Sequence, residues 1–158
     1  MHRLHSCKSQ GAKDGRCKEG RRSRPEGMTP SLGNASNLSV LVLSGNNLTG
    51  RIPSSLEKLV GLSILDLSFN KLDGLVPSNF ANLNNLNSLN LSRNNINGSI
   101  PSELGNLFLL NALDLGSNAL SGTIPKELGN LQSLRTLVLA NNHLNGSIPE
   151  EIFNCTLL

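Results

Sequence analysis

Residues 115–134 read LGSNALSGTIPKELGNLQSL, and this pattern returns with a constant period through most of the chain. The unit that begins at Leu38 follows the consensus L-x-x-L-x-L-x-x-N-x-L-x-G-x-I-P-x-x-L-x-x-L-x-x. Five units in one register make a chance match negligible, so the sequence predicts a repeat structure. The asparagines of the five units recur, without insertion or deletion, at Asn46, Asn70, Asn94, Asn118 and Asn142.

Each unit begins with a short alternating segment. Around Leu41 and Leu43 the period is two, which predicts a strand with these leucines facing inward and Val42 facing outward. Stacking the units pairs such strands in parallel. The asparagine that follows lies where the chain turns, and a buried amide there satisfies backbone groups of its own turn and of the neighbouring one. We therefore predict a structural asparagine ladder along the stack.

The second half of each unit predicts how the coil closes. Gly50 and its equivalents fit a backbone position with positive φ or a close approach between coils. Pro53 lacks an N–H and ends the pairing of the segment that begins near Leu48. Leu56 and Leu59 are three residues apart, which suits a 3₁₀ or short helical turn on the outer side. One unit cannot bury its own leucines, so the core forms only between neighbours.

Composition and charge narrow the class of protein. The chain has 158 residues with 37% hydrophobic and 16% charged content, which rules out wholesale disorder. Residues 1–30 carry eight basic and three acidic side chains, whereas the remainder carries six basic and eight acidic ones. The net charge of +3 therefore belongs to the N-terminal segment, and we expect no nucleic-acid partner for the near-neutral body. The longest apolar run, residues 107–110, predicts no membrane span.

Two regions follow from the pattern. Residues 1–27 contain no repeat residues and form a basic tail. For this tail we expect disorder rather than contact with nucleic acid or a nuclear import receptor, because no aromatic residue interleaves its charges. Residues 28–158 form the repeat domain, with five 24-residue repeats from Leu38 and partial units at both ends. Met28 lies one full repeat before Ile52, and Leu158 lies one full repeat after Leu134.

No arrangement typical of catalysis stands out in the chain. The sequence shows no nucleophile with a base, no paired catalytic carboxylates and no phosphate loop, so we expect no enzyme, no cofactor and no metal. His143 stands in a variable column and is predicted to be a surface histidine. Cys155 takes a leucine position as a small buried hydrophobe. The tail contains four residues of types that can bind zinc, but their spacing matches no compact zinc site. They are His2, His5, Cys7 and Cys17.

Residues 44–62, SGNNLTGRIPSSLEKLVGL, and residues 115–134 resemble the plant-specific class of leucine-rich repeats. This class is found in the ectodomains of plant receptor-like kinases, in receptor-like proteins and in polygalacturonase-inhibiting proteins. The resemblance covers about residues 28–158 and implies an α/β solenoid, a right-handed superhelix with a parallel β-sheet on its concave face. It further implies a non-catalytic module at the cell surface or outside the cell, which binds a protein or peptide ligand or a co-receptor ectodomain. Any kinase domain would lie outside this chain.

The chain departs from this family at both ends. It enters and leaves the repeat pattern in mid-unit, and the cysteine-rich caps that many members carry are missing. Uncapped ends expose core leucines, for which we expect marginal stability or self-association. Two alternatives therefore stand beside a receptor ectodomain. One is a free secreted protein resembling the polygalacturonase inhibitors, and the other is a truncated receptor gene product without function.

Sequons for N-linked glycosylation indicate the cellular compartment of the chain. Their number favours the secretory pathway, where N-x-S/T accepts N-linked glycans, although asparagine-rich repeats also form N-G-S incidentally. A glycan at Asn90 would obstruct the middle of the outward strand face. The seven candidate sites are Asn34, Asn37, Asn47, Asn90, Asn97, Asn145 and Asn154.

Outward positions of neighbouring strands predict a ligand-binding patch. It combines polar side chains with one aromatic and one guanidinium group, the residue types favoured at interface hot spots. The alternative is structural, with Arg93 stacked over Phe69 and the carboxylates keeping the sheet soluble. The predicted ligand-binding residues are Asp66, Phe69, Asn90, Arg93 and Asp114.

Overall fold

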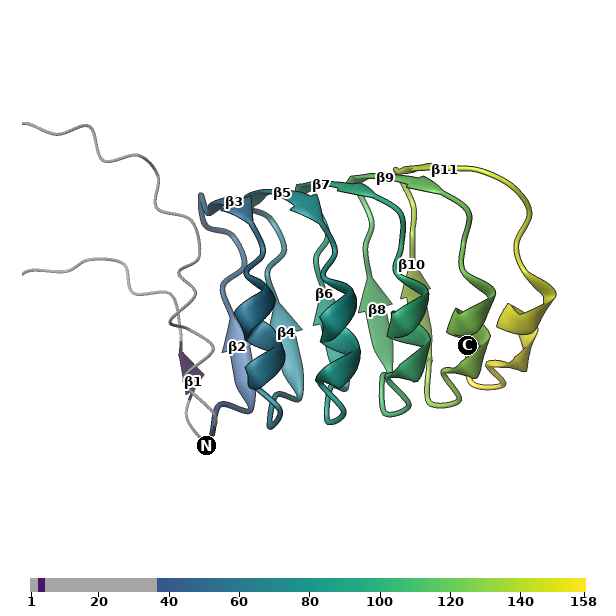
Figure 1. The fold of residues 1–158 in the computed structure, drawn as a ribbon, viewed down its shortest axis with the longest axis horizontal. Helices are drawn as coiled ribbons and strands as arrows, with labels where there is room; N and C mark the ends of the chain where they lie inside the picture. Colours follow the sequence, from purple (N-terminus) through teal and green to yellow (C-terminus); the bar gives the residue numbers. More distant parts are fainter. Residues whose placement is uncertain (1–2, 5–36) are drawn as a thin grey trace, which may run out of the picture.

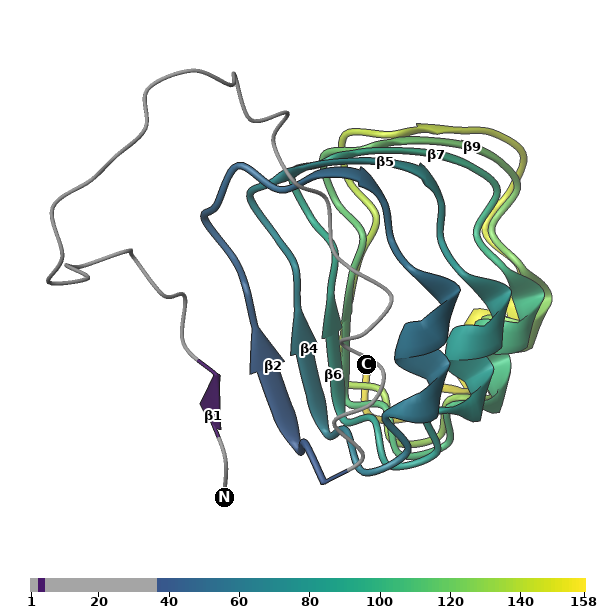
Figure 2. The same cartoon turned by 60° about the vertical axis from the view of Figure 1, so that its left-hand side comes forward.

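The computed structural model describes residues 3–4 and 37–158. These residues form a stack of similar coils, in which strands run side by side along the whole length (Figure 1). A six-stranded sheet and a row of 3₁₀ turns lie on opposite sides, and a second sheet follows a third side (Figure 2). The predicted solenoid is confirmed. The predicted tail and the half-unit from Met28 lie outside the described residues, apart from Arg3 and Leu4.

The six-stranded sheet is parallel, with the order β1-β2-β4-β6-β8-β10. From β2 onward, the pairing joins equivalent positions of successive repeats, as in Leu65↔Leu89 and Leu89↔Leu113. Paired residues in this sheet are therefore separated by one repeat length. A slip of one residue would turn every leucine out of the core. The strands are β1 (Arg3–Leu4), β2 (Val40–Val42), β4 (Ile64–Asp66), β6 (Ser88–Asn90), β8 (Ala112–Asp114) and β10 (Thr136–Val138).

The second sheet is also parallel, with the order β11-β9-β7-β5-β3. Its partners are not equivalent positions of the repeat, as Asp73↔Asn95 and Asn97↔Ala119 show, because its strands are staggered by two relative to the period. The glycines of the Gly50 column have φ of 76° to 79°, as predicted. The strands are β3 (Thr49–Arg51), β5 (Lys71–Leu75), β7 (Asn95–Gly98), β9 (Ala119–Gly122) and β11 (His143–Leu144).

Short 3₁₀ turns close each coil after its proline. The Leu56 N–H donates to Pro53 O at 3.2 Å, and the Leu59 N–H donates to Leu56 O at 3.0 Å, which confirms the predicted turn. Among the described residues, no helix is long and apolar enough to cross a membrane. The turns are η2 (Ser54–Lys58), η3 (Ser78–Asn82), η4 (Ser102–Asn106), η5 (Lys126–Asn130) and η6 (Glu150–Asn154).

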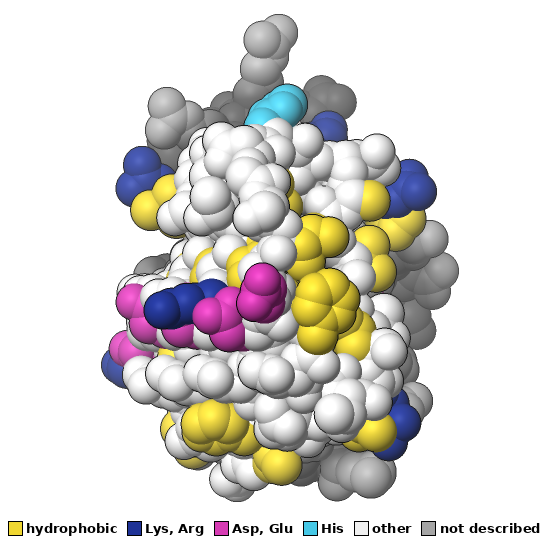
Figure 3. Space-filling view, turned by 90° about the vertical axis from the view of Figure 1, so that its right-hand side faces the viewer, with side chains coloured by type: hydrophobic (Ala, Val, Ile, Leu, Met, Phe, Trp, Pro, Cys, Tyr) yellow, Lys and Arg dark blue, Asp and Glu magenta, His cyan; other side chains and the backbone are white. Residues whose placement is uncertain are grey.

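Burial of each leucine depends on the neighbouring coil. Leu113 and Leu115 are fully buried, whereas Leu137 and Leu139, at the same positions of the last coil, are only partly buried. Figure 3 looks onto this end, where hydrophobic side chains lie exposed in the middle of the surface. Phe153 there is 78% exposed. The core therefore forms between coils, as expected for a repeat structure.

The asparagine column connects the coils through hydrogen bonds. Asn94 Nδ2 donates to Leu67 O at 3.0 Å, Leu91 O at 3.1 Å and Ser92 O at 3.2 Å. Its Oδ1 accepts from the Leu72 N–H at 3.0 Å. One buried amide thus binds the backbone of its own coil and of the preceding coil. The same pattern of bonds is made by Asn70, Asn118 and Asn142.

We predict that Asn94→Ala lowers the free energy of unfolding by about 3 kcal/mol, because the buried Leu72 N–H loses its acceptor and three carbonyls lose a donor. Urea denaturation followed by circular dichroism measures the loss. Asn95→Ala is the matched control, since Asn95 is the next residue and its side chain is exposed. Equal losses for the two variants would contradict the structural role of the ladder.

The 3₁₀ turns pack so closely that two of them have no room for a side chain. A Cβ on Gly129 would lie 2.2 Å from Glu151 O, and a Cβ on Gly105 would lie 2.3 Å from Glu127 O. Both contacts are with backbone atoms of the next coil, which cannot rotate away. Any side chain larger than hydrogen must therefore push the coils apart.

Gly129→Ala is expected to destabilise the chain by about 1–3 kcal/mol through this overpacking. Thermal unfolding measured by calorimetry tests it. Gly116→Ala serves as the comparison, because a Cβ there meets its nearest atoms, Asp114 Oδ1 and Val138 Cγ1, at 3.2 Å and both belong to side chains. A loss at Gly116 as large as that at Gly129 would show that backbone crowding is not the cause.

Candidate ligand-binding site

Three polar side chains stand at the ends of neighbouring strands. Asp66, Asn90 and Asp114 are the last residues of β4, β6 and β8, and the pairing places them side by side. They are partly buried and point to the solvent face, because the leucine before each of them faces the core. Val42 and Val138 occupy the same position in β2 and β10.

One oxygen of each polar side chain closes the turn after its strand. Asp66 Oδ1 accepts from the Ser68 N–H at 3.0 Å and from the Ser68 hydroxyl at 2.6 Å. Asn90 Oδ1 accepts the same two bonds from Ser92, at 3.0 and 2.7 Å. Asp114 Oδ1 accepts from the backbone N–H two residues further on, at 2.9 Å. These are Asx-type turns, a structural task that the repeat pattern did not reveal.

The second polar atom of each side chain takes no part in these turns. Within the described part of the chain, no hydrogen bond uses Asp66 Oδ2, Asn90 Nδ2 or Asp114 Oδ2. Because Asn90 Oδ1 accepts from a backbone N–H, its Nδ2 is oriented away from the turn. Along the solenoid the column therefore presents an acceptor, a donor and an acceptor, about 4.8 Å apart.

Phe69 and Arg93 form a stacked pair beside this column. The prediction that they are outward strand positions is wrong, because β4 and β6 end three residues earlier and both residues lie in the following turns. The Arg93 Cζ atom lies 4.7 Å from the centroid of the Phe69 ring, which is a cation–π contact. Phe69 is 54% exposed, so the pair is accessible.

The backbone at this turn position is left-handed in every described coil. The φ angle is 55° at Phe69, Arg93 and Ser117, 58° at Asn141 and 68° at Gly45. The turn imposes this conformation whatever the side chain. Glycine and asparagine adopt it readily, whereas a bulky side chain pays about 1 kcal/mol or more. The left-handed turn itself therefore does not call for the bulky side chains of Phe69 and Arg93.

The sequence matches the family model described as a leucine-rich repeat region over residues 19–157. The chain belongs to the leucine-rich repeat family. A comparison with curated proteins found no match.

This leucine-rich repeat chain is similar to solved plant receptor ectodomains, which confirms the resemblance drawn from its repeats. The ectodomain of the Arabidopsis thaliana membrane receptor kinase GASSHO1/SCHENGEN3, solved with CASPARIAN STRIP INTEGRITY FACTOR 2, is 42% identical with a TM-score of 0.81. The match covers 83% of this chain and 16% of that one. The Arabidopsis receptor kinase HAESA, solved with the peptide hormone IDA and the co-receptor SERK1, is 44% identical with a TM-score of 0.77. There the match covers 83% and 22%.

The plant peptide hormone receptor RGFR1, solved with RGF2, is 38% identical to this leucine-rich repeat chain, with a TM-score of 0.83. The match covers 84% of this chain and 21% of that one. Across the three structures, this chain spans only about a fifth of the length of its neighbours.

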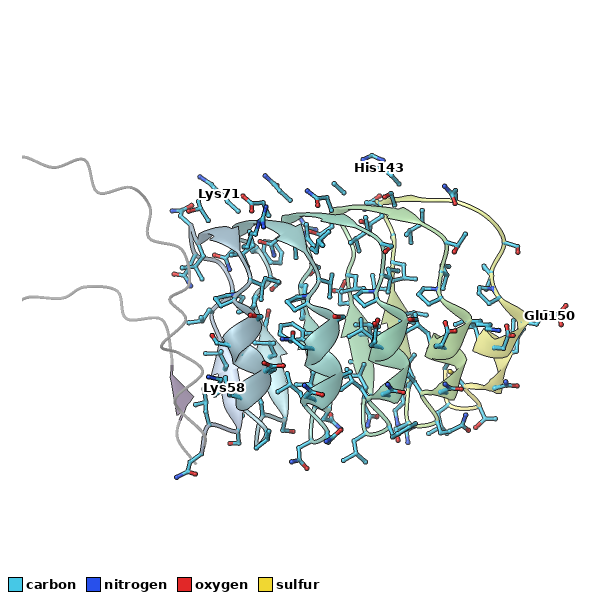
Figure 4. The ribbon with its side chains drawn as sticks, in the orientation of Figure 1. Lys58, Lys71, His143 and Glu150 are labelled. Carbon is cyan, nitrogen blue, oxygen red and sulfur yellow. The ribbon has the colours of Figure 1, made fainter. Side chains whose placement is uncertain are left out.

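The sequence's other candidates lie apart from the strand column. His143 is exposed in β11 and, with Lys71, points outward from the second sheet (Figure 4). Within residues 3–4 and 37–158, no three His, Cys, Asp or Glu side chains are grouped to hold a metal ion. The tail residues considered and rejected as zinc ligands lie outside the described residues, namely His2, His5, Cys7 and Cys17.

Two exposed hydrophobic residues were missed by the sequence reasoning. Phe108 and Leu109 are 61% and 53% exposed in the loop before β8. The loop is held in place, because the Ser133 hydroxyl donates to Phe108 O at 2.9 Å and Asn87 Nδ2 donates to Leu109 O at 3.3 Å. The sequence did contain a signal for their exposure. Both residues occupy repeat positions with no fixed identity, where apolar side chains have no core to enter.

Cys155 lies in the core of the last coil. Its side chain is 4% exposed and its Sγ donates to Leu128 O at 3.5 Å. Burial raises the pKa of the Cys155 thiol, because the charged thiolate is disfavoured away from water. The thiol contributes to stability while it is protonated, and this contribution is lost as the pH rises through the raised folded-state pKa.

Cys155 is expected to react with iodoacetamide at pH 8 about tenfold or more slowly in the folded chain than in urea, because the thiolate is the nucleophile. Mass spectrometry of the peptide that contains Cys155 gives the rate without interference from the other cysteines. The same residue in the unfolded chain is the control. Equal rates would mean that the last coil does not hold Cys155 as the structure shows.

Proposed function

We propose that this leucine-rich repeat chain is a non-catalytic recognition module of a receptor-type ectodomain, which holds an extended peptide or protein segment against the six-stranded sheet. The observation that carries the proposal is the left-handed Phe69–Arg93 pair, since two bulky side chains stand where the turn favours glycine. The binding surface, called here the strand-face patch, consists of Asp66, Phe69, Asn90, Arg93 and Asp114.

The solved neighbours support the type of ligand. GASSHO1/SCHENGEN3 and HAESA were solved with CASPARIAN STRIP INTEGRITY FACTOR 2 and with the peptide hormone IDA, and HAESA also with a co-receptor. This proposal includes a peptide ligand and a co-receptor ectodomain as partner. It also includes a role in signalling or defence and a location at the cell surface or outside the cell.

The patch suits an extended chain that crosses the strands. Such a ligand meets a new coil about every 4.8 Å and places its own polar groups against the acceptor, donor and acceptor of the column. The Arg93 guanidinium offers N–H donors to a carboxylate or carbonyl, and Phe69 offers an exposed ring. Asp66 and Asp114 bring negative charge to either side of Asn90 and favour a ligand with a basic group there.

The patch is held in place before any ligand arrives. The Phe69 N–H donates to Ser92 O at 3.0 Å, and the Arg93 N–H donates to Gly116 O at 2.9 Å. Each anchor is thus bonded through its backbone to the next coil. A pre-organised surface of this kind loses little conformational entropy on binding, so contact energy appears as affinity.

The test removes the two anchors without harming the fold. We would select peptides from a random display library against the natural chain and measure their Kd by calorimetry. The double variant Phe69→Gly with Arg93→Gly relieves the left-handed strain, so it should fold normally. It should weaken binding about 30-fold, as expected for the loss of about 2 kcal/mol at a hot spot.

Asn141→Gly is the matched control, because Asn141 has the same turn conformation two coils beyond Arg93 and lies outside the patch. It should leave Kd within about twofold. Selected peptides that bind the double variant as tightly as the natural chain would refute the strand-face patch. Failure to select any peptide would argue against peptide recognition by this part of the chain.

A further inference from the structure

Two asparagines on the outer side of the second sheet are placed for modification. Asn97 in β7 and Asn145, directly after β11, occupy the same repeat position two coils apart. Each begins the sequon Asn-Gly-Ser, and both asparagines and the serines Ser99 and Ser147 are exposed. Neither asparagine side chain is hydrogen-bonded to another described residue, so both amide nitrogens are accessible.

We propose that Asn97 and Asn145 carry N-linked oligosaccharides. These would cover the side of the solenoid formed by the second sheet, called here the second-sheet edge. In this reaction the amide Nδ2 forms a bond to the anomeric carbon of an oligosaccharide carried on a lipid diphosphate. The bond from that carbon to the phosphate oxygen breaks, the lipid diphosphate leaves, and Nδ2 loses one proton. In the cell this inference rests on the secretory location proposed above.

An exposed leucine beside Asn97 supports the assignment. Leu75 in β5 is the register partner of Asn97 and is 63% exposed. It lies against the middle residue of the sequon, because a Cβ on Gly98 would come 2.4 Å from Leu75 Cδ2. The first sugar on Asn97 would stand next to Leu75 and cover its apolar surface. The protein itself leaves this side chain in water.

The spacing of the two sites also fits bulky groups. Adjacent coils are about 4.8 Å apart, which is too close for two branched oligosaccharides, whereas alternate coils are about 10 Å apart. The coil between the two sites has Ser121 at the corresponding position and therefore no acceptor amide. The edge thus presents one acceptor on every second coil, with a gap between them.

Asn90 is the sequon that the geometry sets apart. Its side chain is partly buried between Asp66 and Asp114, and its Oδ1 accepts two bonds from Ser92. Ser92, the hydroxyl residue of that sequon, is only 7% exposed. An oligosaccharide on Asn90 would stand on the strand-face patch. Modification of the second-sheet edge with an unmodified Asn90 leaves that patch open.

The experiment uses the full chain, fused to a secretory signal peptide and expressed in plant cells. Peptide N-glycosidase in heavy-oxygen water converts each modified asparagine to labelled aspartate, which mass spectrometry locates. We expect label at Asn97 and Asn145 and none at Asn90. Absence of label at either edge site, or label at Asn90, would overturn the inference.

Two variants test the role of the edge. Asn97→Gln should reduce the mass by one oligosaccharide and increase binding of a hydrophobic dye, because Leu75 is uncovered. Asn95→Gln is the matched control, since Asn95 lies in the same strand but begins no sequon. It should change neither reading, and unchanged dye binding by Asn97→Gln would overturn the covering role. These readouts need no ligand, so they remain decisive even if peptide selection on the strand-face patch fails.

Discussion

Each coil of this solenoid is completed by the coil beside it, through contacts of two kinds. Leucines such as Leu113 are fully buried only when a further coil covers them, and Leu137 in the last coil is not. Amides such as Asn94 bond to their own coil and to the preceding one. Because these bonds span only about 3 Å, they hold the rise per coil and the register together. Hydrophobic burial then follows from a spacing that the hydrogen bonds set.

That dependence decides which side chains are free for recognition. Positions that face neighbouring coils carry buried apolar residues, asparagine or glycine, and at Gly129 even a methyl group is excluded. At positions that face solvent the side chain is not restricted in this way, although the backbone conformation still is. The turn after each strand is left-handed whether it holds Gly45, Phe69 or Arg93. A bulky side chain at that turn adds strain, and a role in binding would account for it.

The candidate site was predictable in part. The register of the repeat was enough to place Asp66, Asn90 and Asp114 on adjacent strands, because parallel pairing follows directly from the repeat. The repeat gave no indication that one oxygen of each is used in a turn, since that depends on the local path of the chain. Phe69 and Arg93 were correctly placed side by side but wrongly assigned to strands, because alternation was extended past the end of β4 and β6.

The repeated pattern alone was sufficient for the solenoid, the leucine core, the asparagine column and the 3₁₀ turns after proline. Each follows from a sequence pattern that recurs five times in one register, so the copies reinforce one another. Three-dimensional stacking was needed for the rest. The second sheet pairs positions that are not equivalent in the repeat, a stagger that the period itself does not contain. That stagger brings Leu75 beside Asn97. Asn97 is exposed whereas Ser92 is buried, and this difference depends on which atoms of adjacent coils meet.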